Sequence, residues 1–302
     1  MARPADVRVA LTRAKTIAAG MPDLLIEARR VATTVLAGWH GRRVSGRGET
    51  FWQFRPFVTG EAASAIDWRR SARDDHLYVR EKEWEAAHTV WLWPDPSASM
   101  DFRSPLAPVS KRDRALVLTL ALAEMLAVAG ERIGLLGVSN AILARNAAER
   151  LAVFLAGATG LSAVPDTRQM RRFSDLVLVG DFLDPIDELE AILDSVLKSG
   201  VRAHLVQVFD PIEETFPYAG RTEFLDPETG VRHVVSRAEQ YRDDYRTRLQ
   251  ALRERLGTLC QRLDWTFLVH RTDRPATEPL LALHARLADR QDGLGFPTGR
   301  AA

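Results

Sequence analysis

The stretch RALVLTLALAEMLAVAGERIGLLGV, residues 114–138, decides the fold class. Residues 114–130 are strongly apolar and end at Gly130, a residue type that commonly terminates helices, so they predict a buried helix. The apolar run that follows, 132–138, has the length of a strand and predicts one buried on both faces. A buried helix followed directly by a buried strand is typical of an α/β protein.

The same alternation continues on both sides of this stretch. Short apolar runs predict strands at 89–93, 132–138, 175–182, 202–210 and 265–272. Helical patterns lie between or after them, at 114–130, 147–157, 185–200, 241–263 and 278–289. This alternation predicts a doubly wound, mostly parallel sheet with helices on both faces. A β-hairpin is predicted as an insertion at 221–235, around Asp-Pro-Glu-Thr-Gly.

The chain before residue 89 has a different character. A helical pattern runs from Leu24 to Trp39, and an irregular segment rich in Arg, Gly and Trp follows it. We therefore expect four parts, which are a flexible N-terminus (1–22), the N-terminal helix with the Arg/Trp-rich segment (23–88), the α/β domain (89–290) and a flexible tail (291–302).

Composition and charge exclude several classes of protein. The 41 Lys and Arg residues against 40 Asp and Glu residues give a net charge of +1, which removes a global electrostatic argument for nucleic-acid binding. The single cysteine, Cys260, cannot form an intramolecular disulfide, which fits a reducing compartment. The first 20 residues lack the apolar core of a signal peptide, and no stretch reaches the ~18 apolar residues of a membrane span. We expect a cytoplasmic protein without membrane insertion.

Common catalytic motifs are missing from the sequence. It contains no Gly-rich phosphate loop, no GxGxxG, no HExxH and no G-x-S-x-G. The seven histidines include no pair at i and i+4, and there is no Cys partner nearby that would complete a zinc site.

Polar side chains follow the first predicted strand, in WPDPSASM (93–100). Asp95, Ser97 and Ser99 alternate there, and their oxygens could converge on a small hard cation such as Mg²⁺ or Mn²⁺. The alternative is that Asp95 or Ser97 caps a short helix. Asp181 ends the strand at 175–182, and the carboxyl ends of central strands meet in a doubly wound sheet, so Asp181 could face the two serines. Asp184 is a second choice.

The order of strand, D-x-S-x-S, helix, strand, helix and Asp-ended strand resembles a von Willebrand factor A-type domain. The resemblance implies a metal-ion-dependent adhesion site, in which Asp95, Ser97, Ser99 and Asp181 hold a divalent cation that keeps one position open for an acidic partner residue.

The third loop of such a site departs from the family pattern. The family has a Thr in the loop before the helix that precedes the last ligand strand. The corresponding loop here, SNAILARNAAER (139–150), offers Ser139, Asn140 and Asn146, and Thr159 lies beyond the helix. An alternative interpretation is therefore a degenerate site that binds a partner without a cation.

The segment before the sheet carries the more specific motifs. These are Gly46 and Gly48, Arg55, Ile66-Asp67-Trp68, Ser71-Ala72-Arg73 and Glu81. In this order, and followed by GDFLDP (180–185) and FDPIEETFPYAGRTEFLDPETG (209–230), they resemble the bacterial family known as domain of unknown function 58, over most of residues 20–290. Two departures are Thr59-Gly60-Glu61, where the family usually has Gly-Asp, and Pro94, where many relatives have an aliphatic residue.

The charges of this segment favour a structural role. Residues 42–82 contain nine Lys and Arg and six Asp and Glu, a net charge of +3. The interleaved acids disfavour a nucleic-acid surface, although Trp residues could stack on bases. We expect a cap beside the sheet whose arginines pair with Asp67, Asp74 and Glu81. Its candidate partner-docking residues are Arg55, Asp67, Trp68, Arg73 and Glu81.

The resemblance implies a binding protein and not an enzyme. It also implies an accessory of a MoxR-type AAA+ ATPase, so we expect this chain to engage such an ATPase or a client protein. Two alternatives remain. One is a metal-dependent phosphoester hydrolase, for which Asp184 is the only near candidate for a base. The other is a structural scaffold without a metal.

Overall fold

The computed structural model describes residues 4–39, 51–58, 64, 66–73, 76–82, 88–158, 167–183 and 186–293. The contacts between residues divide the chain into two compact units. The larger unit consists of residues 1–41 and 88–302, and the smaller unit of residues 42–87. Each unit is described below by itself.

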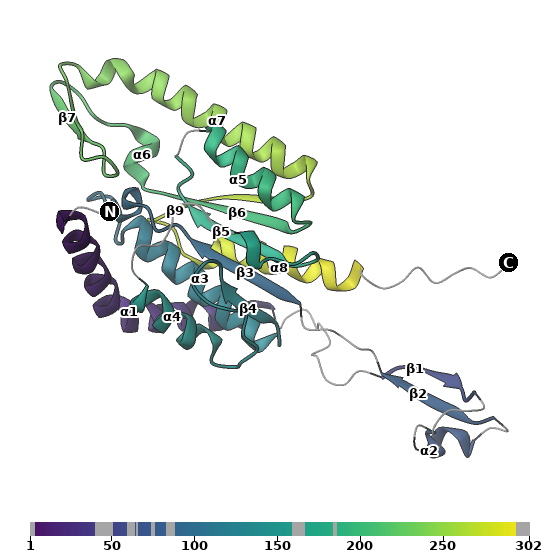
Figure 1. Ribbon diagram of the computed structural model, residues 1–302. Coiled ribbons are helices and arrows are strands. Elements are labelled where there is room, and N and C mark those ends of the chain that lie inside the picture. Colours follow the sequence, from purple (N-terminus) through teal and green to yellow (C-terminus); the bar gives the residue numbers. More distant parts are fainter. Residues whose placement is uncertain are drawn as a thin grey trace. The chain divides into compact units, whose positions relative to one another are not determined.

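The larger unit is built on one parallel sheet (Figure 1). Its strands are β3 (Thr89–Pro94), β4 (Arg132–Leu135), β5 (Asp175–Gly180), β6 (Arg202–Phe209) and β9 (Thr266–Arg271), in the order β4-β3-β5-β6-β9. All four pairings are parallel. The chain moves from β3 outward to β4 and then returns to add the remaining strands beyond β3, so the strand order reverses between β3 and β5. The predicted doubly wound, mostly parallel sheet is confirmed.

Helices cover both faces of this sheet because its strands are apolar on both sides. Their bounds are α3 (Lys111–Val128), α4 (Ala147–Gly157), α5 (Ile186–Lys198), α7 (Arg242–Arg262) and α8 (Thr277–Gly293). Val90 and Leu92 of β3 belong to the core under α3, α4 and α8. Trp91 and Trp93, which alternate with them, belong to the core under α5 and α7.

The N-terminal helix belongs to the larger unit. Helix α1 (Pro4–Trp39) contacts α3, α4 and α8 through a buried face that includes Ala28, Val31 and Val35. The sequence pattern groups this helix with the Arg/Trp-rich segment and predicts its start at Leu24. The helix begins at Pro4, so most of the segment that we predicted to be a flexible N-terminus is helical.

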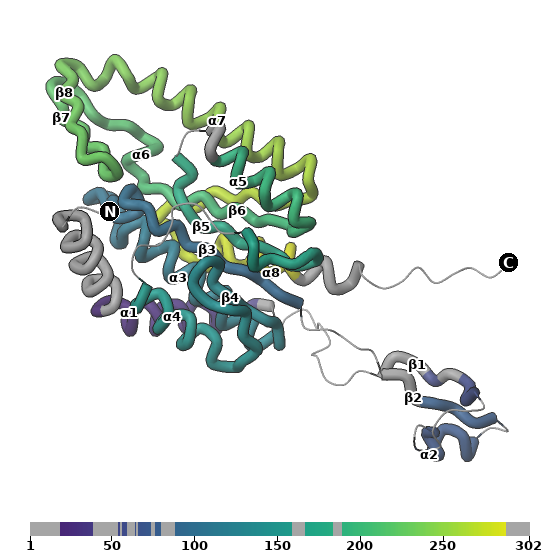
Figure 2. The backbone as a smooth tube through the Cα atoms, viewed as in Figure 1, coloured from purple at the N-terminus to yellow at the C-terminus, as the bar shows by residue number. Residues whose placement is uncertain are grey.

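A small β-hairpin stands at the end of α7 (Figure 2). Strands β7 (Thr222–Leu225) and β8 (Arg232–Val235) pair antiparallel, which confirms the predicted hairpin. The short helix α6 (Pro211–Thr215) leads into it from β6. Phe224 of β7 stacks on Phe216 with ring centroids 5.9 Å apart, and the ring of Phe216 lies 5.0 Å from that of Tyr245 in α7. These ring contacts hold the hairpin against α7 within the larger unit.

The smaller unit contains an antiparallel pair, β1 (Phe51–Pro56) and β2 (Tyr78–Lys82), and the single-turn helix α2 (Trp68–Ser71). Ile66 forms an isolated bridge with Val79 of β2. The guanidinium of Arg70 lies over the ring of Tyr78, 4.5 Å from its centroid, so cation–π contact contributes to this unit. The predicted packing of this segment beside the sheet stays a prediction.

Candidate functional site

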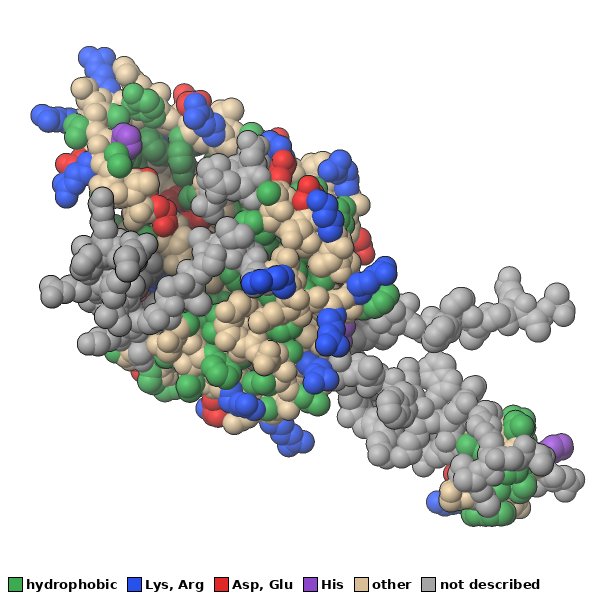
Figure 3. Space-filling view, in the orientation of Figure 1, with side chains coloured by type: hydrophobic (Ala, Val, Ile, Leu, Met, Phe, Trp, Pro, Cys, Tyr) green, Lys and Arg blue, Asp and Glu red, His purple; other side chains and the backbone are tan. Residues whose placement is uncertain are grey.

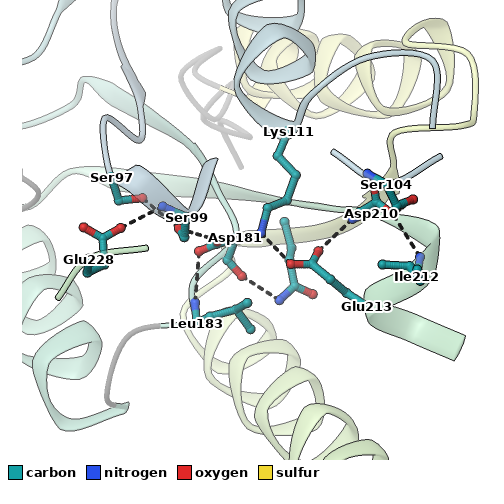
Figure 4. Close-up of polar contacts among 11 residues, drawn as sticks. Ser97, Ser99, Ser104, Lys111, Asp181, Leu183, Asp210, Ile212, Glu213 and Glu228 are labelled. Carbon is teal, nitrogen blue, oxygen red and sulfur yellow. Dashed lines mark hydrogen bonds and ion pairs between the residues drawn. The ribbon is translucent and has the colours of Figure 1, made fainter. Parts of the chain in front are cut away.

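The D-x-S-x-S loop and Asp181 meet at the carboxyl ends of two neighbouring strands. Strand β3 ends at Pro94 and β5 at Gly180, and the main-chain N–H of Asp95 donates to the carbonyl oxygen of Val179 at 2.8 Å. The strand order reverses between β3 and β5, and doubly wound sheets bind ligands in the crevice at that point. We call the residues gathered here the strand-end site (Figure 4).

Asp95 shapes the loop rather than facing solvent. Its carboxylate is buried, and Oδ1 accepts a hydrogen bond from the main-chain N–H of Ser97 at 2.8 Å. A Cβ atom added at Gly180 would lie 2.9 Å from both Cβ and Oδ2 of Asp95. Only a glycine at the end of β5 therefore lets the Asp95 side chain lie against that strand.

The hydroxyl groups of Ser97 and Ser99 do not cap a helix. Ser97 stands at the N-cap position of the 3₁₀ turn η2 (Ala98–Asp101), but its side chain makes no capping hydrogen bond. Its hydroxyl lies 3.0 Å from that of Ser99. Arg112 fixes the loop from behind by donating to the carbonyl oxygen of Ser97 at 2.6 Å and by pairing with Asp101. The hydroxyl groups are thereby directed along the loop toward Asp181 (Figure 4).

Asp181 is the residue on which the site converges. Its Oδ2 accepts hydrogen bonds from the hydroxyl of Ser99 at 2.7 Å and from the ammonium of Lys111 at 2.8 Å, and its Oδ1 accepts one from the main-chain N–H of Leu183 at 3.2 Å. Gln207 of β6 donates to the main-chain carbonyl of Asp181 at 2.9 Å. Asp181 is 2% exposed, so the site has a dry, fixed anchor.

Lys111, the first residue of α3, bridges two carboxylates. Its Nζ also donates to Oε1 of Glu213 in α6 at 2.7 Å, and the side chain is 1% exposed. Burial disfavours the charge of Lys111, but the carboxylates of Asp181 and Glu213 outweigh burial and raise its pKa. Burial also raises the pKa of Glu213, against the opposing effect of Lys111. Both pKa shifts are those expected when Lys111 and Glu213 form an ion pair that has little contact with water.

Glu213 is held in place by the turn before it. Asp210 accepts hydrogen bonds from the main-chain N–H groups of Ile212 and Ser104, at 2.9 Å and 2.8 Å. Glu213 accepts one from the main-chain N–H of Asp210 at 2.8 Å, which completes a capping box. The carboxylate of Glu213 therefore reaches Lys111 with one oxygen and the start of its own helix with the other.

The hairpin supplies a further carboxylate. Glu228, in the turn between β7 and β8, accepts a hydrogen bond from the main-chain N–H of Ser99 at 2.8 Å. Glu228 is exposed, and Asp226 orders its turn by accepting from the main-chain N–H of Glu228 at 2.9 Å and from the hydroxyl of Thr229. Figure 4 shows Glu228 at the Ser97 end of the network and Asp210 at the other end.

The residues do not suit a divalent cation bound beside Asp181 while Lys111 holds it. Mg²⁺ and Mn²⁺ bind carboxylate oxygens at about 2.1 Å, and such a cation on Oδ2 would lie close to the Lys111 ammonium and be repelled by it. Among the described residues, no group of three His, Cys, Asp or Glu side chains is placed to hold a metal ion. The predicted binding of Mg²⁺ or Mn²⁺ therefore requires the Lys111 ammonium to move away from Oδ2 of Asp181.

The sequence comparison identifies the family. A family model described as protein of unknown function DUF58 matches residues 53–255, which include the D-x-S-x-S loop, Asp181 and the hairpin. The chain belongs to the DUF58 family. It is 28% identical over 275 residues to the uncharacterized proteins Mb1516 of Mycobacterium bovis and Rv1480 of Mycobacterium tuberculosis, in each case over 85% of this chain and 86% of the relative.

Solved structures give a weaker likeness. The protein BatB of Bacteroides thetaiotaomicron matches with a TM-score of 0.37 and 11% identity, over 68% of this chain and 100% of that one. An aerotolerance-related membrane protein of Bacteroides fragilis matches with a TM-score of 0.39 and 15% identity, over 67% of this chain and 100% of that one. At these TM-scores the two structures add nothing to an argument about function. Within the described part of this DUF58 chain, no helix is both long and apolar enough to cross a membrane.

The structure brings the four predicted metal-site residues into one network, as Asp95, Ser97, Ser99 and Asp181 surround the same strand ends. Asp184 and Thr159 lie outside the described residues. The loop expected to supply a threonine has structural tasks. The hydroxyl of Ser139 accepts from the main-chain N–H of Leu135 at 3.0 Å, whereas Asn146 stands at the N-cap position of α4 without a capping hydrogen bond from its side chain.

The candidate docking residues of the smaller unit are spread over its elements. Asp67 caps α2 by accepting from the main-chain N–H of Arg70 at 2.9 Å, and Trp68 is 62% exposed rather than clamped. Arg73 is exposed after that helix. Arg55 and Glu81 lie in β1 and β2, but their side chains lie outside the described part, as do Gly46, Gly48, Asp74 and residues 59–61.

Lys111, Glu213 and Glu228 are among the residues of the site that the sequence does not predict. Lys111 opens a charged first turn of α3, Lys-Arg-Asp-Arg, so nothing in the sequence distinguishes it from the charged residues beside it. Glu213 and Glu228 stand in the quoted stretch 209–230, but nothing in their spacing indicates that they reach the strand-end site. These contacts between residues far apart in the sequence depend on the geometry of the turns in which Glu213 and Glu228 stand.

Proposed function

We propose that this DUF58 protein is a non-enzymatic, protein-binding adaptor that engages its partner at the strand-end site. The observation that supports this most directly is the meeting of Ser99, Asp181 and Glu228 at the switch point of the sheet. Ligands of doubly wound proteins bind in that crevice. The site contains fixed polar groups and an exposed carboxylate, and a protein surface can dock on these without any chemical step.

The proposed partner is a MoxR-type AAA+ ATPase, with a further protein as client. This part of the proposal rests on the family resemblance of the motifs in residues 41–88 and 209–230, and the DUF58 match covers those of them that lie within residues 53–255. The single buried thiol, Cys260, agrees with a cytoplasmic location, where such an ATPase would be met.

The charge of the site indicates the chemistry of the contact. The carboxyl groups of Asp95, Asp181, Glu213 and Glu228 stand against the ammonium of Lys111. Without a divalent cation, this excess of negative charge favours a basic side chain on the partner. With a divalent cation at the serines, an acidic partner residue would be favoured instead. On the face seen in Figure 3, Lys and Arg side chains are scattered over the described surface, which agrees with a protein partner better than with nucleic acid.

A pull-down from the native organism tests the proposal. The baits are the wild-type chain, Asp95→Ala and Glu228→Ala, with Glu254→Ala on the exposed side of α7 as the matched control. We expect the wild type and the control to recover an AAA+ ATPase and the two site variants to lose it. Circular dichroism checks that each bait is folded, and the ATPase is then produced alone and its binding measured directly.

Other results would contradict the proposal. Failure of every bait to recover an AAA+ ATPase would exclude the proposed partner. Equal recovery by wild type and both site variants would indicate a scaffold that binds elsewhere. Turnover of a phosphoester by the purified chain, lost in Asp95→Ala, would indicate an enzyme.

A further inference from the structure

We propose that the ammonium group of Lys111 is the resident cation of the strand-end site and takes the position beside Asp181 that a divalent metal ion would occupy in an adhesion site. The proposal uses the same site as the proposed function. Its test measures metal binding by the isolated chain, so its failure is distinguishable from a failure to find the partner.

The contacts of Lys111 are those expected of a bridging cation. Its Nζ joins Asp181, at the end of β5, to Glu213 of α6 at 2.8 Å and 2.7 Å. The same oxygen of Asp181 also accepts the hydroxyl proton of Ser99 at 2.7 Å. The ammonium thereby joins the end of β5 directly to the start of α6, and the shared oxygen of Asp181 connects it to Ser99 in the loop after β3.

The position of Lys111 in its helix supports the same assignment. It is the first residue of α3, where the exposed N–H groups of the helix create a positive potential that disfavours a cation. Its side chain is also almost completely buried, and burial of an unpaired ammonium is strongly unfavourable. Both effects oppose a lysine here, so its charge depends on the two carboxylates, and those carboxylates depend on the lysine.

Removal of the ammonium should convert the site into one that takes a metal. Without Lys111, the carboxylates of Asp181 and Glu213 and the hydroxyl of Ser99 would be left together without a positive charge. Such oxygens are the ligands that Mg²⁺, Mn²⁺ and Ca²⁺ prefer. In Lys111→Met, whose side chain has a similar length and no charge, a divalent cation can enter the place of the ammonium.

Thermal unfolding of the chelator-treated full chain provides the test, in titrations with MgCl₂, MnCl₂ and CaCl₂ to millimolar concentrations and with NaCl at matched ionic strength. We expect the Tm of the wild type to be unchanged by the divalent cations. Lys111→Met should unfold roughly 5–10 °C lower without metal, because two buried carboxylates lose their partner. Its Tm should then rise by roughly 5 °C at a cation concentration about 100 times the dissociation constant.

Control variants locate the effect. Lys198→Met removes an exposed lysine from the end of α5 and should leave the chain insensitive to metal. Lys111→Arg keeps the charge and should also remain insensitive. The addition of Ser99→Ala to Lys111→Met should weaken or abolish the metal-dependent rise, because the hydroxyl beside Asp181 is then missing.

Two results would overturn the proposal. One is a metal-dependent rise in the Tm of the wild type that disappears in Ser99→Ala. The other is a folded Lys111→Met variant whose Tm stays unchanged at every cation concentration. If Lys111→Met does not fold, the paramagnetic resonance of Mn²⁺ mixed with the wild type decides, since bound Mn²⁺ overturns the proposal and free Mn²⁺ supports it. Refolding of Lys111→Gln in CaCl₂ repeats the variant test with a polar side chain.

Discussion

Glu228 accepts a hydrogen bond from the main-chain N–H of Ser99 at 2.8 Å, although 129 residues separate the two in the sequence. The hairpin that carries Glu228 is held at its base by the rings of Phe216, Phe224 and Tyr245. Its turn is closed by a hydrogen bond from the main-chain N–H of Gly230 to the carbonyl oxygen of Asp226 at 2.8 Å. The hairpin is therefore fixed at its base and contacts the D-x-S-x-S loop at its tip.

Loss of the Glu228 carboxylate should release this tip. In Glu228→Ala, the Ser99 amide loses its acceptor, and we expect its hydrogen exchange to become faster while the core strands keep their protection. Because the contact is exposed, the free energy of unfolding should fall by less than about 1 kcal/mol. Exchange measured by NMR on single amides tests this. Glu223→Ala breaks only the pair with Arg232 inside the hairpin, so faster exchange of the Ser99 amide in this control as well would contradict the assignment.

Gly180 should tolerate no side chain. In Gly180→Ala the new Cβ would meet Asp95 at 2.9 Å, and the Asp95 carboxylate would have to leave its place against β5. We expect a loss of about 1–3 kcal/mol in the free energy of unfolding, as for other overpacked sites. Urea unfolding measures it. Gly157→Ala at the end of α4 is the control, since nothing lies within 4 Å of its Cβ. Equal stability of the two variants would show that Asp95 is not confined by β5.

The sheet could be predicted from the sequence because its strands are buried on both faces. Runs such as 175–182 are nearly all apolar and most are followed by a helical pattern, so the alternation indicated the class and the parallel pairing. The helix at 147–157 was predicted with the bounds that the structure shows. Where all side chains of a segment fit the same pattern of burial, the local sequence preference agrees with the fold.

The start of α1 and the composition of the site could not be predicted in this way. Before Leu24 the helical pattern is weaker, and the helix nevertheless continues back to Pro4. At the site, the pairing of Asp181 with Ser99 followed from the strand order, but Lys111, Glu213 and Glu228 did not. Their side chains reach the site through a helix start, a capping box and a hairpin turn, and these geometries have no periodic signal in the sequence.

Leu120 should be among the most sensitive positions of the larger core. It is fully buried in α3, the helix that contacts α1, α4 and α8 and covers the centre of the sheet. Leu120→Ala leaves a cavity there, and we expect a loss of about 2–5 kcal/mol in the free energy of unfolding. Val128→Ala, in the last turn of the same helix with a side chain 67% exposed, should change stability by less than about 0.5 kcal/mol. Similar losses for both variants in urea would show that α3 is not central to the core.

Stability should fall in mild acid because of His270. This side chain is buried in β9, and burial lowers its pKa from 6.5 to about 4, with a further lowering by Arg114 and an opposing effect of Asp273. The unfolded chain therefore takes up a proton at a higher pH than the folded chain. The stabilisation is complete above pH 6.5 and is lost as the pH falls toward 4, by about 3 kcal/mol from this residue.

Urea midpoints between pH 4 and pH 7 test this dependence on His270. In His270→Gln the slope of stability against pH should become smaller, whatever the variant costs at pH 7. Some slope should remain, because burial also lowers the pKa of His284. His233→Gln, on the exposed strand β8, should leave the slope as in the wild type. If His270→Gln has the same slope of stability against pH as the wild type, protonation of the buried imidazole does not lower the free energy of unfolding.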